Sequence, residues 1–210
     1  MYGVVGIGAA YAALLFAPRP PDDGQPLPTI SGMTAVSRVE PLYSQVASRV
    51  SGEDVEVRCW SESDWTELTK EIGDWTHGKL LLGPWSGFAA EGKNRVSLAP
   101  AVCDSIGRWA YERDWPESYR EAYYFAWSVK ALAHETQHVR GFEDEATAEC
   151  YALQTMRDIG IELGFGEERA QNLAEYAWHY VYPRADPEYR SSECRDGGAL
   201  DLDPHSSVWP

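Results

Sequence analysis

The sequence predicts a single α+β domain that is mainly helical and carries a small β-sheet. Apolar residues recur at three- and four-residue steps through most of the chain, which is the period of an amphipathic helix. Only a few short stretches show the alternation or the flanking turns that are typical of strands. The chain has 210 residues, 44% of them hydrophobic, which is enough for one core and too few for two full domains.

The first half of the chain is expected to alternate helices with short strands. Gly52 ends an amphipathic pattern, and the run VEVRCW after it alternates as a half-buried strand does. Ser61, followed three residues later by Asp64, resembles a capping box and starts a helix. Helices are therefore predicted over residues 34–50 and 61–73, and strands over residues 55–60, 83–90 and 95–98.

The second half is expected to be helical. Pro100 and Ser118 begin two helices, because proline is favoured in a first helical turn and serine caps a helix N-terminus. Gly141 ends the longer of the two, and Pro183 follows the last helical pattern. The predicted helices cover residues 100–111, 119–140, 144–159 and 167–182.

Two segments precede the predicted domain. Residues 1–17 contain no charged side chain, yet as a helix they reach only about 24 Å against about 30 Å of bilayer hydrocarbon. This segment is expected to be an uncleaved signal anchor, with a cleaved signal or a buried N-terminal helix as alternatives. Residues 18–33 are rich in proline and form a predicted linker.

The remaining chain divides into a domain and a tail. Residues 34–183 hold the predicted helices and strands. Residues 184–210 are rich in Asp, Ser, Gly and Pro and are expected to pack irregularly on the domain. Together with the N-terminal segment, this division predicts a membrane-anchored or secreted protein whose domain is extracytoplasmic.

The charge balance excludes one class of partner. The chain has 33 acidic and 18 basic residues, which gives a formal net charge of −15 at pH 7. Such a surface repels phosphate backbones, so a nucleic-acid-binding role is not expected.

The four cysteines are widely spaced and form no CxxC pair, which argues against a zinc site made of thiolates. We expect the disulfides Cys59–Cys103 and Cys150–Cys194, because each pair joins neighbouring stretches and the second holds down the tail. Other pairings are open, and buried free thiols are the alternative if the protein is not exported.

One pentapeptide has the pattern of a catalytic site. His134, Glu135 and His138 form an HExxH motif near the end of the predicted helix 119–140. Imidazoles four residues apart project from one face of a helix, where both can bind one zinc ion. Glu135 then lies beside the metal and can take a proton from a metal-activated water. Zn²⁺ is therefore the expected cofactor, and Glu135 the expected general base.

An acidic run after Gly141 offers further ligands. If the turn reverses the chain, the next helix lies antiparallel to the first and brings Glu145 beside the metal. Glu149, one turn further along, is then level with His134 and can fix the tautomer of that ring. Glu145 is the expected third ligand, and Glu149 the supporting carboxylate.

These residues resemble the gluzincin group of zinc metallopeptidases. In that group HExxH is followed on a second helix by a ligating glutamate and, four residues later, by a carboxylate that supports a histidine. The resemblance covers about sixteen residues. It implies a zincin-like pair of active-site helices, with zinc bound by His134, His138 and Glu145, Glu135 as general base and Glu149 in support.

Other interpretations of the motif stay open. The pattern HExxHxxGxxD, which ends at Asp144, is similar to a metzincin arrangement and makes Asp144 the third ligand. Glu149 itself is another candidate for that place. A pair of histidines held by core or acidic neighbours, without any metal, is the remaining interpretation.

Two further features bear on catalysis. His179 and Tyr180 on the last predicted helix are candidates to stabilise a transition state, although packing and solvent exposure are the commoner roles of such residues. The strand pair within residues 83–98 offers an edge on which an extended peptide can add as a strand.

We therefore expect a zinc-dependent metallopeptidase that hydrolyses peptide bonds with a zinc-activated water. Its expected substrate is a peptide or protein, and its expected membrane contact is through residues 1–17. The competing hypothesis is a non-catalytic, zinc-stabilised module of the cell envelope that binds a protein partner. Hydrolysis of a non-peptide bond by the same water is a third hypothesis.

Overall fold

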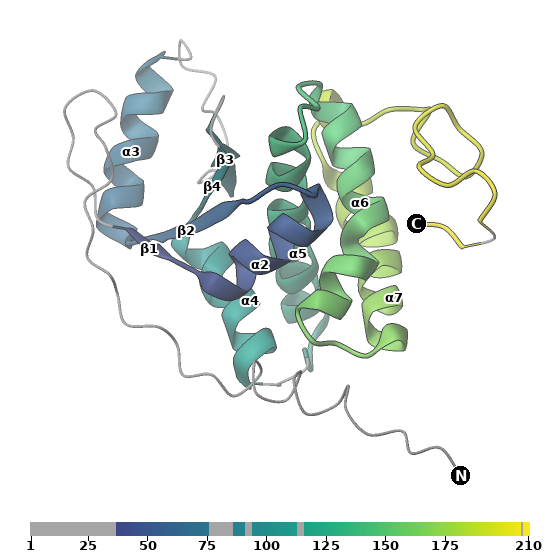
Figure 1. Ribbon diagram of the computed structural model, residues 1–210, viewed down its shortest axis with the longest axis horizontal. Coiled ribbons are helices and arrows are strands. Elements are labelled where there is room, and N and C mark those ends of the chain that lie inside the picture. The colour runs from purple at the N-terminus through teal and green to yellow at the C-terminus, as the bar shows by residue number, and fades with distance from the viewer. Residues whose placement is uncertain (1–36, 76–85, 91–93, 113–115, 207) are drawn as a thin grey trace.

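A computed structural model of the chain describes residues 37–75, 86–90, 94–112, 116–206 and 208–210. The predicted N-terminal segment and linker, residues 1–17 and 18–33, lie outside these residues, as does the start of the strand predicted over residues 83–90. The described part is a mainly helical α+β domain with one small sheet, as the sequence predicts (Figure 1). Within it, no helix combines the length and apolar character that a membrane crossing needs.

Helices alternate with short strands in the first half of this domain and dominate the second half. The strands are β1 (Ser37–Val39), β2 (Glu56–Trp60), β3 (Gly87–Ala89) and β4 (Arg95–Leu98). The α-helices are α2 (Pro41–Ser51), α3 (Glu62–Trp75), α4 (Pro100–Glu112), α5 (Tyr119–Val139), α6 (Glu145–Glu162) and α7 (Glu167–Tyr176). A π-helical turn η1 (Ala177–Val181) and two 3₁₀ turns, η2 (Tyr182–Arg184) and η3 (Pro187–Tyr189), follow α7.

The sheet has four strands in the order β1-β2-β4-β3. The central strands β2 and β4 are parallel, with Val57 opposite Val96, and both of these side chains are fully buried. β1 pairs antiparallel with β2, and β3 pairs antiparallel with β4. β1 and β3 are therefore the edge strands, and of these two it is β3 that packs against α5.

The prediction of a helix over residues 34–50 is wrong at its start. Ser37–Val39 form the edge strand β1, and the helix begins only at Pro41. A proline disfavours helical backbone at the preceding residue, and Glu40 is extended with φ −105° and ψ 102°. The chain therefore has a strand where its side-chain spacing alone indicates a helical turn.

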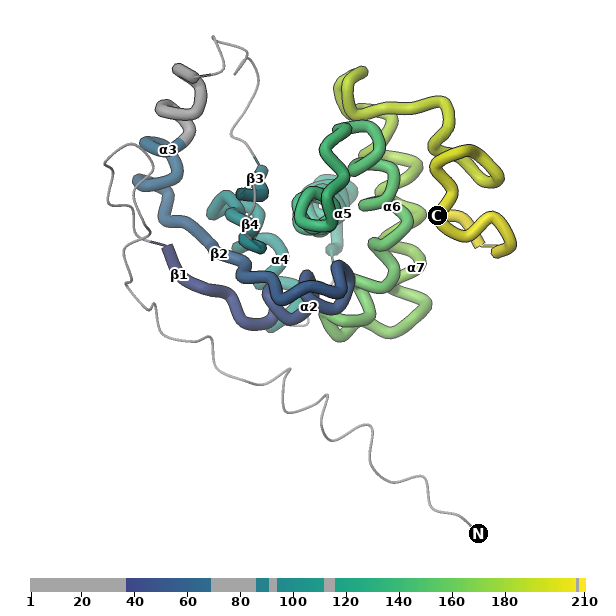
Figure 2. The backbone as a smooth tube through the Cα atoms, turned by 45° about the horizontal axis from the view of Figure 1, so that its top comes forward, coloured from purple at the N-terminus to yellow at the C-terminus, as the bar shows by residue number. Residues whose placement is uncertain are grey.

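Helix α5 is the centre of the molecule. It packs against β3 and β4 on one side and against α6 on another, and α7 packs in turn on α6 (Figure 2). Ser118 caps its N-terminus, as the sequence predicts, and it does so in a capping box with Glu121. The buried residues Phe125, Val129 and Leu132 join it to the core.

A tight turn after α5 reverses the chain. Gly141 has φ 90°, a left-handed conformation that glycine adopts without strain. Its amide donates to the His138 carbonyl at 2.9 Å, and the Phe142 amide donates to the Gln137 carbonyl at 3.2 Å, the two bonds of a Schellman motif. α6 can therefore start beside the end of α5 and run back along it.

Both predicted disulfides are present. Cys59–Cys103 joins β2 to α4, and Cys150–Cys194 joins α6 to the C-terminal tail. Two disulfides indicate an oxidising, extracytoplasmic environment. The tail is irregular apart from its 3₁₀ turns, whereas the helix predicted over residues 167–182 is α-helical only to Tyr176 and continues as η1 and η2.

The packing of α6 on α7 depends on a glycine. A Cβ atom at Gly160 would lie 2.9 Å from Cβ and 3.2 Å from Cα of Ala170. Gly→Ala inside a helix ordinarily stabilises by up to about 1 kcal/mol. Here we expect Gly160→Ala to lower the free energy of unfolding by about 1–2 kcal/mol, because overpacking outweighs the gain in helix propensity. Denaturant unfolding monitored by circular dichroism measures this change.

The matched control is the double variant Gly160→Ala/Ala170→Gly, which removes the Cβ atom that the new methyl group meets. The loss in the double variant should be smaller than the sum of the two single losses. Additive losses, or a Gly160→Ala protein more stable than wild type, would contradict the proposed close approach.

Candidate metal centre

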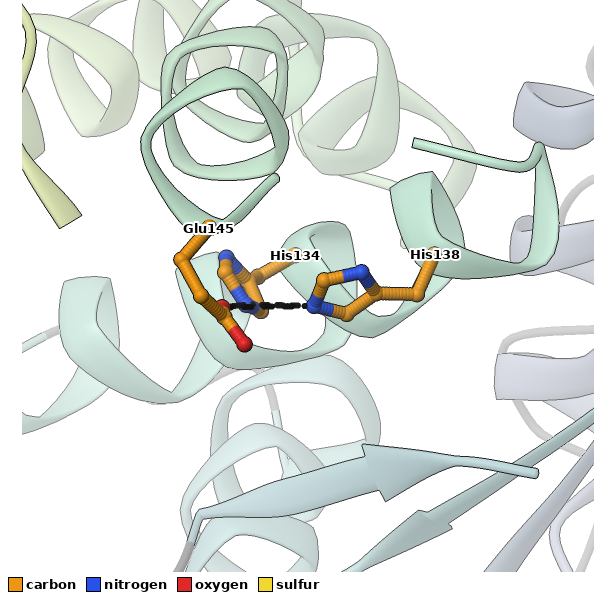
Figure 3. Close-up of side chains that lie close together, drawn as sticks. All are labelled: His134, His138 and Glu145. Carbon is orange, nitrogen blue, oxygen red and sulfur yellow. Dashed lines mark hydrogen bonds and ion pairs between the residues drawn. The ribbon is translucent and has the colours of Figure 1, made fainter. Parts of the chain in front are cut away.

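Three predicted ligands meet where α5 ends and α6 begins. His134 and His138 lie on α5, one turn apart, and Glu145 is the first residue of α6. Nε2 of His134 lies 3.0 Å from Nε2 of His138 and 3.0 Å from Oε2 of Glu145. The remaining separation, His138 Nε2 to Glu145 Oε2, is 3.4 Å. Figure 3 shows the three side chains pointing toward one another.

The spacing of these donor atoms fits one metal ion. Bonds of about 2.0–2.1 Å at tetrahedral angles hold neighbouring ligand atoms of zinc about 3.3 Å apart. The separations of 3.0, 3.0 and 3.4 Å match the edges of one face of such a tetrahedron. Two neutral imidazoles and one carboxylate also form a donor set that binds divalent transition metals. The group His134, His138 and Glu145 can therefore hold a metal ion.

The ring of His138 is oriented by the turn between the helices. Its Nδ1 lies 2.7 Å from the carbonyl oxygen of Phe142, close enough for the ring N–H to donate. A proton on Nδ1 leaves Nε2 with a free lone pair on the side of the candidate centre. The reversal at Gly141 thus places Glu145 and also selects the tautomer of His138.

A buried carboxylate supports His134 from behind. Oε2 of Glu149 lies 3.0 Å from Nδ1 of His134, at ion-pair distance, although the ring N–H direction falls outside hydrogen-bond geometry. Lys130, one turn before His134, donates to both carboxylate oxygens of Glu149 at 2.7 and 3.0 Å. The side chain of Glu149 is 0% exposed, so this ion pair balances a charge that water cannot reach.

These contacts shift the protonation of the ligands. Burial alone would lower the pKa of His134, but the neighbouring carboxylates of Glu145, Glu149 and Glu135 raise it to about 9. Burial alone would raise the pKa of Glu145, but His134 and His138 hold it at about 2. Without metal, the centre is therefore a cationic imidazole beside an ionised carboxylate, and a metal ion must displace the imidazole proton.

Glu135 belongs to α5, and its side chain packs against the edge strand β3. It is 5% exposed, and a Cβ atom at Gly87 would stand 3.0 Å from its Cγ. Burial raises the pKa of the Glu135 carboxyl, and the positive charge of His134 and His138 only partly offsets this effect. The structure therefore places beside the candidate centre a carboxyl group whose proton affinity is increased.

A tyrosine that the sequence analysis does not single out also faces the centre. The ring of Tyr189, in η3, lies 5.6 Å from the ring of His134, measured between centroids. Burial and the nearby carboxylates Glu145, Glu135 and Glu149 raise the pKa of its hydroxyl. Nothing in the residue spacing indicates this approach, because Tyr189 comes from the irregular tail and reaches the centre through tertiary structure.

The other candidates lie elsewhere. The carboxylate of Asp144 caps α6, where its Oδ1 accepts hydrogen bonds from the amide and the hydroxyl of Thr147. Tyr180 packs against the rings of Tyr119 and Tyr176, and His179 beside it is exposed. Asp144, the alternative third ligand, does not belong to the group of possible ligands found among the described residues.

No protein-family model, curated protein or solved structure matches this chain. What the site can do chemically follows from its own residues. These are two imidazoles and one carboxylate spaced for a metal ion, with a buried carboxyl group and a tyrosine ring close by.

We expect single substitutions to identify the third ligand. If the group holds a metal ion, His138→Ala and Glu145→Ala should each abolish its stoichiometric binding, because each removes one of three possible ligands. Asp144→Asn should retain the metal, because the Asp144 side chain caps a helix. Glu149→Gln should weaken metal binding by about 10–100-fold, as loss of a supporting carboxylate does. Elemental analysis of the purified full chain and competition with a chelator measure these effects.

The metal-free protein should show a strongly shifted histidine. We expect an NMR titration to give His134 a pKa of about 9. Because this value is raised above the ordinary 6.5, the ionised ring stabilises the fold. That contribution is complete below about pH 6.5 and is lost as the pH rises through about 9, which denaturant unfolding across this range can follow.

Glu149→Gln is the control for this titration, because it removes one of the three carboxylates that raise the pKa of His134. The pKa should fall toward the ordinary value in that variant. An unshifted His134 in the wild-type, metal-free protein would contradict the ion pairs described for the centre.

Proposed function

We propose that the protein is a zinc-dependent peptidase whose general base is Glu135. One observation carries the proposal. The carboxyl group of Glu135 is buried and interacts electrostatically with His134, His138 and Glu145, whose donor atoms fall within 4.8 Å of one another on helices joined by a single turn. A purely structural metal site does not need a neighbouring acid with increased proton affinity.

The ligand set favours zinc in a catalytic setting. Structural zinc sites are usually closed by four protein ligands, whereas catalytic sites use three and keep one position open. The candidate group in the described chain has three members, His134, His138 and Glu145. When bound, zinc would supply a Lewis acid that lowers the pKa of water and polarises a carbonyl group.

Glu135 moves the proton in this proposal. Its carboxylate accepts a proton from the attacking water and later gives a proton to the departing amine of the peptide. A carboxyl group works best in both directions when its pKa lies closer to neutrality than the ordinary value. Burial raises the pKa of Glu135 in that direction.

Tyr189 stabilises the charge that develops on the carbonyl oxygen of the substrate. Because its pKa is raised, the hydroxyl stays protonated in neutral and alkaline solution and can donate a hydrogen bond. Hydrogen-bond donors aimed at such a charge are among the largest contributors to catalysis. Tyr189 thus takes the role for which His179 and Tyr180 were the candidates in the sequence.

The edge strand β3 provides a place for the substrate. A peptide in extended conformation can add to the free edge of a sheet through main-chain hydrogen bonds. β3 is an edge strand, and Gly87 at its start adjoins Glu135. A bound peptide would therefore pass close to the general base. Peptide or protein substrates outside the cytoplasm fit the two disulfides.

Glu135→Gln tests the proposal directly. The change keeps the size of the side chain and removes its ability to accept a proton, so we expect zinc content to stay at one per chain. The rate of peptide hydrolysis should fall by at least about 100-fold. Cleavage of an unfolded protein, followed by mass spectrometry of the fragments, measures the rate and identifies the cleaved bonds.

The same variant separates the peptidase from the non-catalytic binding module. A module that only binds a partner has no turnover in the wild type, and Glu135→Gln leaves its partner affinity unchanged. Wild-type protein that holds zinc but cleaves no peptide bond would therefore refute the proposed activity. Asp144→Asn serves as the matched control, since it changes a carboxylate on the turn and should leave both zinc and turnover intact.

A further inference from the structure

The C-terminal tail passes over the candidate centre before it is fixed to α6. Tyr189 contacts the ring of His134, and five residues later Cys194 forms a disulfide with Cys150. Cys150 directly follows Glu149, the residue that supports His134. Adjacent residues of α6 therefore have two roles. Glu149 supports His134, and Cys150 is the covalent attachment of the tail segment whose Tyr189 lies over that ring.

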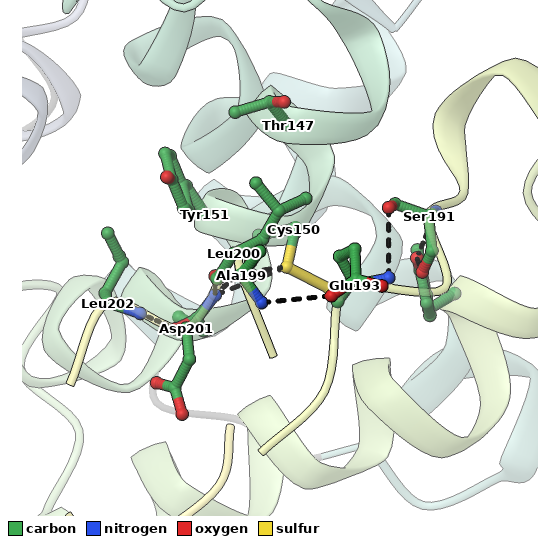
Figure 4. Close-up of a disulfide and its surroundings, with 12 residues drawn as sticks. Thr147, Cys150, Tyr151, Ser191, Glu193, Ala199, Leu200, Asp201 and Leu202 are labelled. Carbon is green, nitrogen blue, oxygen red and sulfur yellow. Dashed lines mark hydrogen bonds between the residues drawn. A yellow bond between two sulfur atoms is a disulfide. The ribbon is translucent and has the colours of Figure 1, made fainter. Parts of the chain in front are cut away.

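Contacts other than the disulfide also bear on this part of the tail. The turn η3 packs against α6, although none of its residues is fully buried. Nearby, the hydroxyl of Tyr182 exchanges hydrogen bonds with the backbone of Ser191 at 3.0 and 3.2 Å. Beyond the disulfide, the side chain of Gln154 forms hydrogen bonds with the backbone of Leu200 and Leu202, at 2.7 Å each. Figure 4 shows Leu200 and Leu202 of the tail beside Cys150 on α6.

The bonds to Gln154 fix the chain after Cys194 and act on Tyr189 only through the intervening residues. The disulfide is the nearest covalent restraint on Tyr189, and both of its cysteines are buried, with 0% and 3% exposure. A buried crosslink to a rigid helix limits how far a segment five residues away can move.

We infer that Cys150 and Cys194 are positioning residues for the metal centre, because their disulfide holds Tyr189 over His134. The inference rests on the proposed function for its kinetic consequence, but the placement of Tyr189 can be tested without activity. Removing the disulfide should release Tyr189 while the ligands on α5 and α6 remain in place.

The second disulfide provides a matched control. Cys59–Cys103 and Cys150–Cys194 both span a sequence separation of 44 residues, so removing either relaxes the unfolded chain to the same extent. Cys59–Cys103 joins β2 to α4 and includes no part of the tail. A role limited to stability predicts similar effects of the two losses, whereas a positioning role predicts different ones.

The first experiment uses the full chain loaded with Co²⁺ and labelled with ¹³C in its tyrosine rings. A paramagnetic ion shifts the signals of rings close to it, and Tyr189→Phe identifies the signal of Tyr189. We expect that shift in the wild type and in Cys59→Ala/Cys103→Ala, and its loss in Cys150→Ala/Cys194→Ala. An unchanged shift in Cys150→Ala/Cys194→Ala would overturn the inference.

A second variant covers the case in which that protein does not fold. Insertion of Gly-Ser-Gly-Ser between Ser192 and Glu193 keeps both disulfides and the hydrogen bonds between Tyr182 and Ser191, but slackens the link between Tyr189 and Cys194. The Tyr189 shift should be lost in this variant. It should persist when the same residues are inserted between Asp196 and Gly197, outside the link. Equal shifts in the two insertion variants would also overturn the inference.

The kinetic experiment measures kcat on an unfolded protein substrate. We expect Tyr189→Phe and Cys150→Ala/Cys194→Ala each to lower kcat by about 10–100-fold with zinc retained, and Cys59→Ala/Cys103→Ala to lower it by less than about threefold. If the disulfide acts through Tyr189, its removal in the Tyr189→Phe background should change kcat by less than about threefold. Additive losses would refute action through Tyr189.

These outcomes keep the inference separate from the proposed function. If the wild type hydrolyses no peptide, the peptidase proposal fails, and the cobalt-shifted signal of Tyr189 still decides the positioning inference. If turnover depends on Glu135 but the Tyr189 shift survives loss of Cys150–Cys194, the peptidase proposal stands and the positioning inference fails.

Discussion

The antiparallel packing of α5 and α6 is the constraint on which the site depends. Residues that come later on α6 contact residues that come earlier on α5, as antiparallel packing requires. Glu145 contacts His138 and His134, and Glu149 contacts His134 and Lys130. That register follows from the left-handed backbone at Gly141, which lets the chain turn back within a few residues. Without this reversal of the chain, the carboxylates of α6 would not reach the imidazoles of His134 and His138.

The centre is held in shape by charge. Moving Glu149 and Lys130 away from water is costly, and their mutual hydrogen bonds offset much of that cost. A paired Glu149 then draws positive charge onto His134, and Glu145 does the same from the other side. The imidazoles are thereby oriented before any metal binds, so less conformational freedom has to be lost when it does.

The parts of the fold and site that could be predicted are those set by local chemistry. Ser118 and Gly141 act within a few residues, and each predicts its helix boundary correctly. The HExxH spacing is also local, and it brings the rings of His134 and His138 together. The approach of Tyr189 to His134 and of Gly87 to Glu135 could not be predicted, because tertiary packing brings these residues together. The strand β1 could not be predicted from its own residues either, because its pairing with β2, about twenty residues later, decides its conformation.

All three possible metal ligands lie within one helical hairpin, whereas each disulfide closes a separation of 44 residues. Contacts between near neighbours in sequence form faster than those that close long loops. During synthesis, which proceeds from the N-terminus, the hairpin is also complete before Cys194 is made. The chain itself therefore sets an order of maturation: the three possible ligands can meet before the Cys150–Cys194 disulfide forms. In the proposed peptidase, metal binding would accordingly precede the fixing of Tyr189 over His134.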